Sequence, residues 1–135
     1  MAGKDKIRVI TTKIGLDSHV IGIMLISKAL SQTGMDVIYL GKFQTPKMIV
    51  KSALQEDVDV ICISCLTSNY QQILRVLDLL KEKDRQDIPV IAGGTIPKQH
   101  VSELKKAGVN EVFLPGGDLD TIVDYVTSVA KQGWK

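Results

Sequence analysis

The chain has 135 residues, of which 44% are hydrophobic and 24% are charged, and its formal net charge is +2. This length suits one domain with a sizeable core, and we expect residues 1–135 to form a single domain. The 17 basic and 15 acidic residues are spread along the chain, which argues against a nucleic-acid-binding surface. Neither a secretory signal nor a membrane-spanning run is recognisable, so the sequence predicts a cytoplasmic protein that is not bound to a membrane.

Strand-like runs alternate with amphipathic helical patterns along the chain. The first strand is predicted over residues 7–14, and the first helix follows over 22–33, with Gly34 as a stop signal. The next strand covers 37–40. Thr45 and Pro46 then open a helix as its cap and first residue. The remaining elements are predicted in the order strand 58–64, helix 69–83, strand 88–92, helix 97–107, strand 111–114 and helix 118–131.

This alternation predicts a parallel sheet with helices on both faces. Right-handed crossovers favour a doubly wound, five-stranded α/β domain with strand order 2-1-3-4-5, the flavodoxin-like arrangement. Ligands of such folds bind beyond the carboxyl ends of the strands, near the switch point between strands 1 and 3. Four stretches should therefore converge at one edge of the sheet: residues 13–22, 64–66, 93–95 and 115–117.

The sequence argues against several common uses of this fold. The loop after the first strand lacks the small and hydroxyl residues of a flavin phosphate loop, and no G-x-G-x-x-G fingerprint is present. The third strand does not end in the aspartate of a phosphoacceptor domain. Cys62 and Cys65 form a C-x-x-C pair, but residues three apart on a strand point to opposite faces. We expect buried structural thiols there rather than a redox pair.

His19 is the remaining chemical clue, in the stretch Asp17-Ser-His-Val-Ile-Gly22 at the switch point. An imidazole is a good metal ligand when an acidic partner such as Asp17 holds its other nitrogen, and Lys13 can hold Asp17 in turn. His100, the other histidine, lies far along the chain. Either His19 has a structural role, or it binds a metal that brings its own ligands, such as the cobalt of a corrin.

Three short motifs carry a resemblance to a known family. Residues 17–22 resemble the D-x-H-x-x-G motif of cobalamin-binding domains, Ser64-Cys-Leu66 their S-x-L motif, and Gly93-Gly94 their G-G motif. The likeness to the cobalamin domain of the methylmalonyl-CoA mutase family extends from about residue 7 to about residue 126. The chain departs from the usual pattern around the histidine at Ser18, Val20 and Ile21.

The resemblance implies a role for each residue near the metal. His19 would replace the dimethylbenzimidazole base of the cofactor as the lower axial ligand of cobalt. Asp17 would accept a hydrogen bond from the His19 ring, and Lys13 would pair with Asp17.

The resemblance also implies a slot for the displaced nucleotide tail. Gly22, Ser64, Gly93 and Gly94 would leave room for this tail. The Ser64 hydroxyl would bond the free benzimidazole nitrogen, and Leu66 would pack near the tail or the corrin. Gly116 is expected in the turn that lines the same edge.

By this resemblance the chain is the cofactor-binding small subunit of an adenosylcobalamin-dependent acyl-CoA mutase, which is an isomerase. A separate large subunit with a (β/α)₈ barrel would bind the acyl-CoA. The small subunit would have no catalytic residue and would be inactive alone. Two alternatives stay open: a corrinoid carrier of a methyltransferase, and a non-enzymatic flavodoxin-like module in which His19 binds nothing.

Overall fold

A five-stranded parallel sheet forms the centre of the molecule, as the computed structural model shows for residues 6–14, 21–65, 70–114 and 118–132. Its order is β2-β1-β3-β4-β5, which confirms the predicted topology. The strands are β1 (Arg8–Ile14), β2 (Asp36–Gln44), β3 (Val60–Cys65), β4 (Val90–Gly94) and β5 (Glu111–Phe113).

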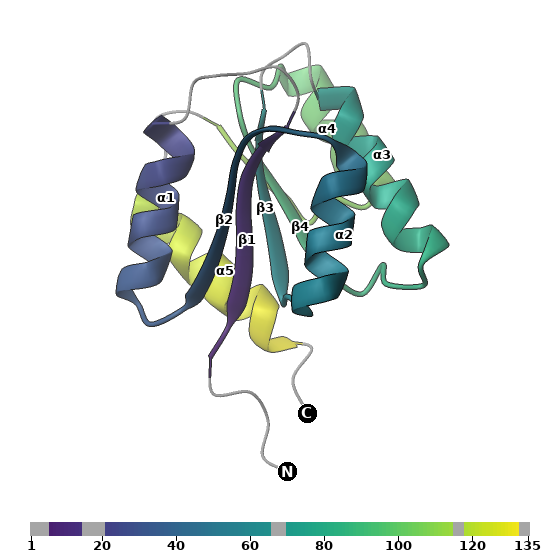
Figure 1. The fold of residues 1–135 in the computed structure, drawn as a ribbon. Coiled ribbons are helices and arrows are strands. Elements are labelled where there is room, and N and C mark those ends of the chain that lie inside the picture. The colour runs from purple at the N-terminus through teal and green to yellow at the C-terminus, as the bar shows by residue number, and fades with distance from the viewer. Residues whose placement is uncertain (1–5, 15–20, 66–69, 115–117, 133–135) are drawn as a thin grey trace.

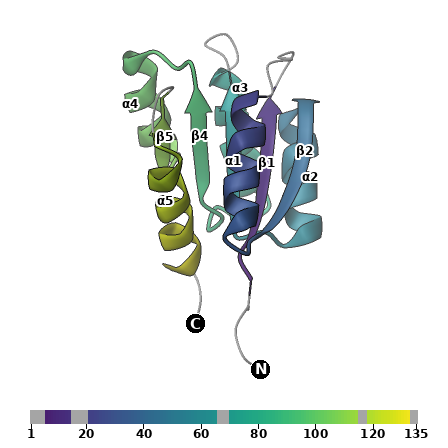
Figure 2. The same ribbon diagram turned by 90° about the vertical axis from the view of Figure 1, so that its left-hand side faces the viewer.

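Five helices in the described residues cover the two faces of this sheet (Figure 1). They are α1 (Ile21–Gln32), α2 (Pro46–Glu56), α3 (Tyr70–Glu82), α4 (Lys98–Ala107) and α5 (Leu119–Gln132). Helices α1 and α5 lie on one face, which Figure 2 shows towards the viewer, and α2, α3 and α4 lie on the other. In the described part of the chain, no helix is both long and apolar enough to span a membrane.

Alternation along each strand creates two separate cores. Ile10, Ile61 and Ile63 pack towards α2, α3 and α4, whereas Val9 and Val60 pack towards α1 and α5. Because both faces are buried, β3 is almost continuously apolar, as parallel sheets require, whereas β1 carries the buried polar residues Thr11, Thr12 and Lys13.

The predicted bounds of three strands were wrong by two residues or more. Strand β3 begins at Val60 instead of residue 58. Strand β2 runs to Gln44 instead of ending at residue 40, because its pairing with β1 continues past Gly41 through shifts in register. Strand β4 covers 90–94 rather than 88–92, so Gly93 and Gly94 end the strand instead of following it. The predicted start of α2 is confirmed, since the Thr45 hydroxyl accepts a hydrogen bond of 3.2 Å from the Met48 amide.

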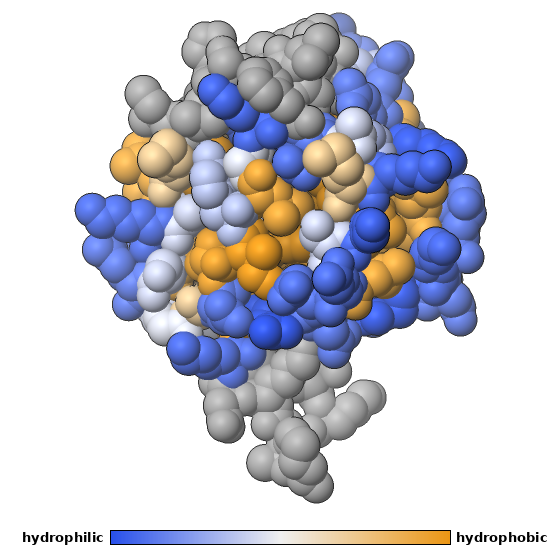
Figure 3. Space-filling model, viewed as in Figure 1, coloured by the Kyte–Doolittle hydropathy of each residue, from blue (hydrophilic) through white to orange (hydrophobic). Residues whose placement is uncertain are grey.

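Strand β2 is an open edge of the sheet. Figure 3 looks onto this edge and shows apolar side chains in the middle of the face, with hydrophilic surface around them. Val37, Ile38 and Leu40 are half-buried there, and Tyr39 is exposed. The register shifts that follow Thr11 make this edge irregular, which hinders pairing with a strand of another molecule.

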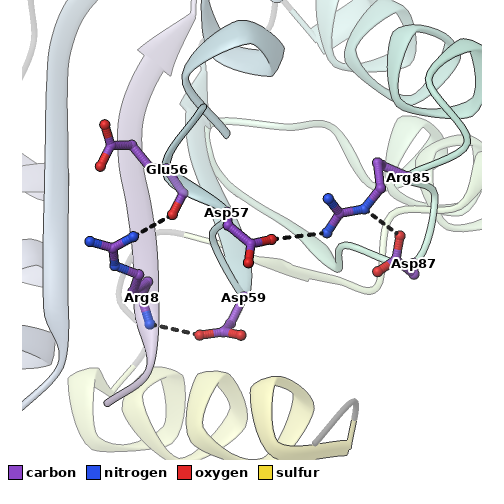
Figure 4. A network of polar contacts seen from close by, with 6 residues as sticks. All are labelled: Arg8, Glu56, Asp57, Asp59, Arg85 and Asp87. Atoms are coloured by element: carbon purple, nitrogen blue, oxygen red, sulfur yellow. Dashed lines mark hydrogen bonds and ion pairs between the residues drawn. The ribbon is translucent and has the colours of Figure 1, made fainter. Parts of the chain in front are cut away.

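A polar network joins the elements at the amino end of the sheet (Figure 4). The Arg8 guanidinium donates to the Glu56 carbonyl at 2.6 Å and to Asp36 Oδ2 at 3.2 Å. The Arg8 amide donates to Asp59 Oδ2 at 2.8 Å, so one residue ties β1 to β2, to the end of α2 and to the start of β3. Arg85 binds Asp57 and Asp87 beside it, and these contacts raise the pKa of the Arg85 guanidinium.

We expect Arg8→Met to lower the free energy of unfolding by about 1–2 kcal/mol, because it removes charge-assisted hydrogen bonds at a half-buried position. Urea unfolding measures this loss. Arg75→Met is the matched control, because the Arg75–Glu82 pair has side chains that are 54% and 59% exposed. That exposed pair should contribute less than about 0.5 kcal/mol. Equal losses in the two variants would contradict a special role for Arg8.

Candidate functional site

Four residues form a row across the carboxyl end of the sheet. Lys13 of β1 is in register with Ser64 of β3, Ser64 with Gly93 of β4, and Gly93 with Phe113 of β5. Residues in register on parallel strands direct their side chains to the same face. This face is the one that α1 and α5 cover, so the row lies beneath these two helices.

A cavity of about 330 Å³ opens over three members of this row, Ser64, Gly93 and Phe113, between the sheet and helices α1 and α5. Its lining is mostly aliphatic and aromatic. Among the described residues, the polar side chains on the lining are those of Cys62 and Ser64. Leu25, Leu114 and Leu119 also line it, and each is more than one third exposed. The cavity can therefore bury a flat apolar group and offer it a hydroxyl to bond.

Glycines make this space. Gly93 has no side chain, which leaves a gap in the row between Ser64 and Phe113, and a Cβ atom there would also lie tightly against the Phe113 carbonyl oxygen, at 3.2 Å. A Cβ atom at Gly22, in the first turn of α1, would have no atom of the described residues within 4 Å. The cavity is thus bounded by two positions at which a side chain would take up ligand space.

Gly94 is required for a different reason. Its φ of +113° is a conformation that L-residues with side chains rarely adopt, and a Cβ atom there would overlap the Cys65 carbonyl oxygen. Gly94 therefore allows β4 to approach β3 closely at the end of the sheet.

The side chain of Lys13 is buried, with only 4% of the residue exposed, and its Nζ donates to Ser64 Oγ over 3.2 Å. The sequence predicted Lys13 as a partner of Asp17, which lies outside the described residues. It did not predict the contact with Ser64. An ammonium has three donor hydrogens, so a bond to Ser64 is compatible with a second partner.

Hydroxyl groups fix α1 above the cavity. The hydroxyls of Thr11 and Ser27 are 2.6 Å apart, and Ser27 donates to the Ile23 carbonyl over 2.7 Å. Thr11 is fully buried on β1. The Thr11–Ser27 contact ties the middle of α1 to β1 and so fixes the helix that carries Gly22 over the sheet. This contact was not predicted from the sequence, although Thr11 within a strand and Ser27 within the facing helix are the residues that could have indicated it.

The two cysteines do not form a redox pair. Both are free and buried, Cys62 in the core beneath α1 and α5 and Cys65 in the opposite core, as predicted. Burial raises the pKa of the Cys62 thiol from 9.0 to about 12. The thiol on the cavity lining therefore stays protonated and unreactive at neutral pH.

Of the predicted site residues, the structure brings Lys13, Gly22, Ser64, Gly93 and Gly94 together at one edge. Asp17, His19, Leu66 and Gly116 lie outside the described residues, and their roles stay predictions.

The described residues contain no group of three or more histidine, cysteine or acidic residues that could hold a metal ion. His100 stacks on Tyr70, with ring centroids 4.1 Å apart, and its Nδ1 lies 3.6 Å from Glu103. These contacts give His100 a packing role between α3 and α4.

The fold and the cavity define a class of protein: a flavodoxin-like domain with an apolar slot at the carboxyl edge of its sheet. Residues 7–123 match the model of the B12 binding domain family. The chain belongs to this family.

The comparisons also find relatives of similar length. The 2-hydroxyisobutanoyl-CoA mutase small subunit of Aquincola tertiaricarbonis is 40% identical over 94% of this chain and 95% of that protein. The pivalyl-CoA mutase small subunit of Xanthobacter autotrophicus is 38% identical over 97% and 88%. A crystal structure of a cobalamin-binding protein from Desulfitobacterium hafniense superposes with a TM-score of 0.80 at 20% identity. The superposition covers 93% of the present chain and 60% of the longer Desulfitobacterium hafniense chain. This likeness supports the fold.

The raised pKa of Cys62 predicts a specific loss of stability at alkaline pH. Below pH 9.0 the thiol is protonated in both the folded and the unfolded chain, whereas above it only the unfolded chain loses the proton. The contribution of Cys62 to the free energy of unfolding should therefore fall by about 1.4 kcal/mol per pH unit as the pH rises above 9. Other titrating groups cancel when the wild type is compared with Cys62→Ala. Urea unfolding from pH 8 to 10.5 should show the stability difference between the two narrowing, and parallel curves would contradict it.

Proposed function

We propose that this chain is the cobalamin-binding small subunit of an adenosylcobalamin-dependent acyl-CoA mutase. The observation that carries the proposal is the apolar cavity over Gly93, which has a single hydroxyl group among its described side chains and lies at the switch point of the sheet. The two small subunits of acyl-CoA mutases that resemble this chain along almost its whole length support it.

The cavity fits the nucleotide tail of cobalamin in chemistry. Benzimidazole is flat and apolar and has one free ring nitrogen when it does not bind cobalt. The missing side chains of Gly22 and Gly93 leave room for it, and Ser64 has the hydroxyl to bond that nitrogen. A more polar base would bring groups that the described lining cannot satisfy, and each would cost free energy when buried.

His19 would then be the axial ligand of cobalt, with Asp17 accepting a hydrogen bond from the other ring nitrogen. This second contact orients the imidazole and raises its basicity. Adenosylcobalamin supplies a cobalt–carbon bond that can break homolytically to start a radical rearrangement. The residues of this chain would hold and orient the cofactor.

A separate large subunit with a (β/α)₈ barrel would complete the enzyme by binding the acyl-CoA. The small subunit itself would supply no acid, base or nucleophile. The purified small chain should therefore bind cobalamin and have no mutase activity until that subunit is added.

The axial ligand is tested with cob(II)alamin, whose electron spin couples to the nucleus of an axial nitrogen. A ligand from the protein predicts three superhyperfine lines in the natural-abundance chain and two in a chain with ¹⁵N-labelled histidine. We expect His19→Ala to lose this pattern and to weaken binding by at least about tenfold. His100→Ala is the matched control, because His100 packs against Tyr70 on another face. A three-line pattern that persists in the labelled chain would mean that the cofactor's own base remains on cobalt.

The cavity is tested separately by filling it. Gly22→Leu should leave the free chain folded and no less stable, because leucine favours a helix and the added Cβ atom meets none of the described residues within 4 Å. It should weaken cobalamin binding by about tenfold or more, because the new side chain occupies ligand space. Ser31→Leu, at an exposed position of the same helix, is the control. Titrations with the same affinity for Gly22→Leu and the wild type would place the tail elsewhere.

A further inference from the structure

The contact between Lys13 and Ser64 joins a buried charge to the hydroxyl group on the cavity lining. The two residues are 51 positions apart in sequence, yet they are paired across β1 and β3, and the Nζ–Oγ distance is 3.2 Å. Lys13 is 4% exposed. Burying an ammonium group costs free energy unless its hydrogens are bonded. The hydrogen bond to Ser64 offsets part of this desolvation cost.

The chemistry of Lys13 and Ser64 determines which of them donates the hydrogen bond. A lysine ammonium donates hydrogen bonds and accepts none, so the Ser64 oxygen is the acceptor. A serine hydroxyl has one hydrogen, which must then point to another acceptor. Ser64 lines the cavity beside Gly93, where no side chain fills the next position of the row. The hydroxyl hydrogen is thereby available to whatever the cavity binds.

We propose that Lys13 is a positioning residue that sets the polarity of Ser64, so that the Ser64 hydroxyl donates into the cavity and the cavity selects a ligand with a bare acceptor atom at that point. The inference rests on the proposed function, which makes this ligand the tail of a corrinoid and the acceptor an unprotonated ring nitrogen of its base. Without Lys13 the hydroxyl can turn, and its bond to the ligand loses its preset direction.

A double-mutant cycle of Lys13→Met, Ser64→Ala and the double variant tests this coupling. Binding is measured with adenosylcobalamin and with cobinamide, the corrinoid that lacks the nucleotide tail. We expect Lys13→Met to weaken adenosylcobalamin binding about fivefold more when Ser64 is present than when it is alanine. With cobinamide, the effect of Lys13→Met should be the same in both backgrounds, because no base reaches Ser64. Any influence of Lys13 on Asp17 is common to the two backgrounds and cancels.

Lys51→Met, at an exposed position of α2, controls for the loss of one positive charge and should leave both affinities unchanged. If Lys13→Met does not fold, as judged by circular dichroism, Lys13→Gln replaces it. Its amide both donates and accepts and so no longer dictates the direction of the hydroxyl.

Equal effects of the Lys13 substitution in the two backgrounds with adenosylcobalamin, within twofold, would overturn the inference and leave the proposed function standing. A wild-type chain that binds neither corrinoid would overturn the proposed function itself.

Discussion

The register of the parallel strands at their carboxyl ends is the constraint on which the site depends. It places Lys13, Ser64, Gly93 and Phe113 in one row, on one face. A shift by one residue in any strand would turn its member of the row to the opposite face. The cavity, the lysine contact and the gap over Gly93 are therefore all consequences of pairing, and none is a property of a single loop.

The contacts that hold the strands in place lie at the amino end of the sheet, and the cavity lies at its carboxyl end. At the amino end, the contacts of Arg8 with Glu56 and Asp59 join β1, the end of α2 and the start of β3. Pairs of this kind fix where each strand begins, and the strand lengths then determine which residues reach the other end. At the carboxyl end the structure omits side chains instead, at Gly93 and at Gly22. Contacts at the amino end of the sheet, where no ligand is expected, thus stabilise the strand register that defines the cavity at the carboxyl end.

Much of this arrangement could be predicted from the sequence, because its causes are local or topological. Alternating elements and right-handed crossovers leave few strand orders and favour the one observed, and the capping role of Thr45 follows from its place before Pro46. The end of β2 was mispredicted because Gly41 resembles a break, although pairing with β1 carries the strand past it. The bond between Lys13 and Ser64 was also out of reach, since it depends on register between segments 51 residues apart. Sequence motifs indicated which small residues matter, but only the packing of α1 and α5 shows the volume that they leave.

That volume is itself an argument for a ligand. Packed interiors leave few spaces larger than a water molecule, and each empty space forfeits contacts that neighbouring side chains would gain. A side chain at position 22 would fill part of the cavity and favour the helix, so a chain selected for stability alone would have one there. The chain has a glycine at this position and a buried lysine that holds the one hydroxyl of the described lining. Both features are explained if the complex of the protein with its ligand, and not the free protein, is the state that must be stable. A ligand that binds only the folded chain stabilises it by an amount that grows with the logarithm of the ligand concentration divided by Kd, so the cavity costs the protein little when the ligand is abundant.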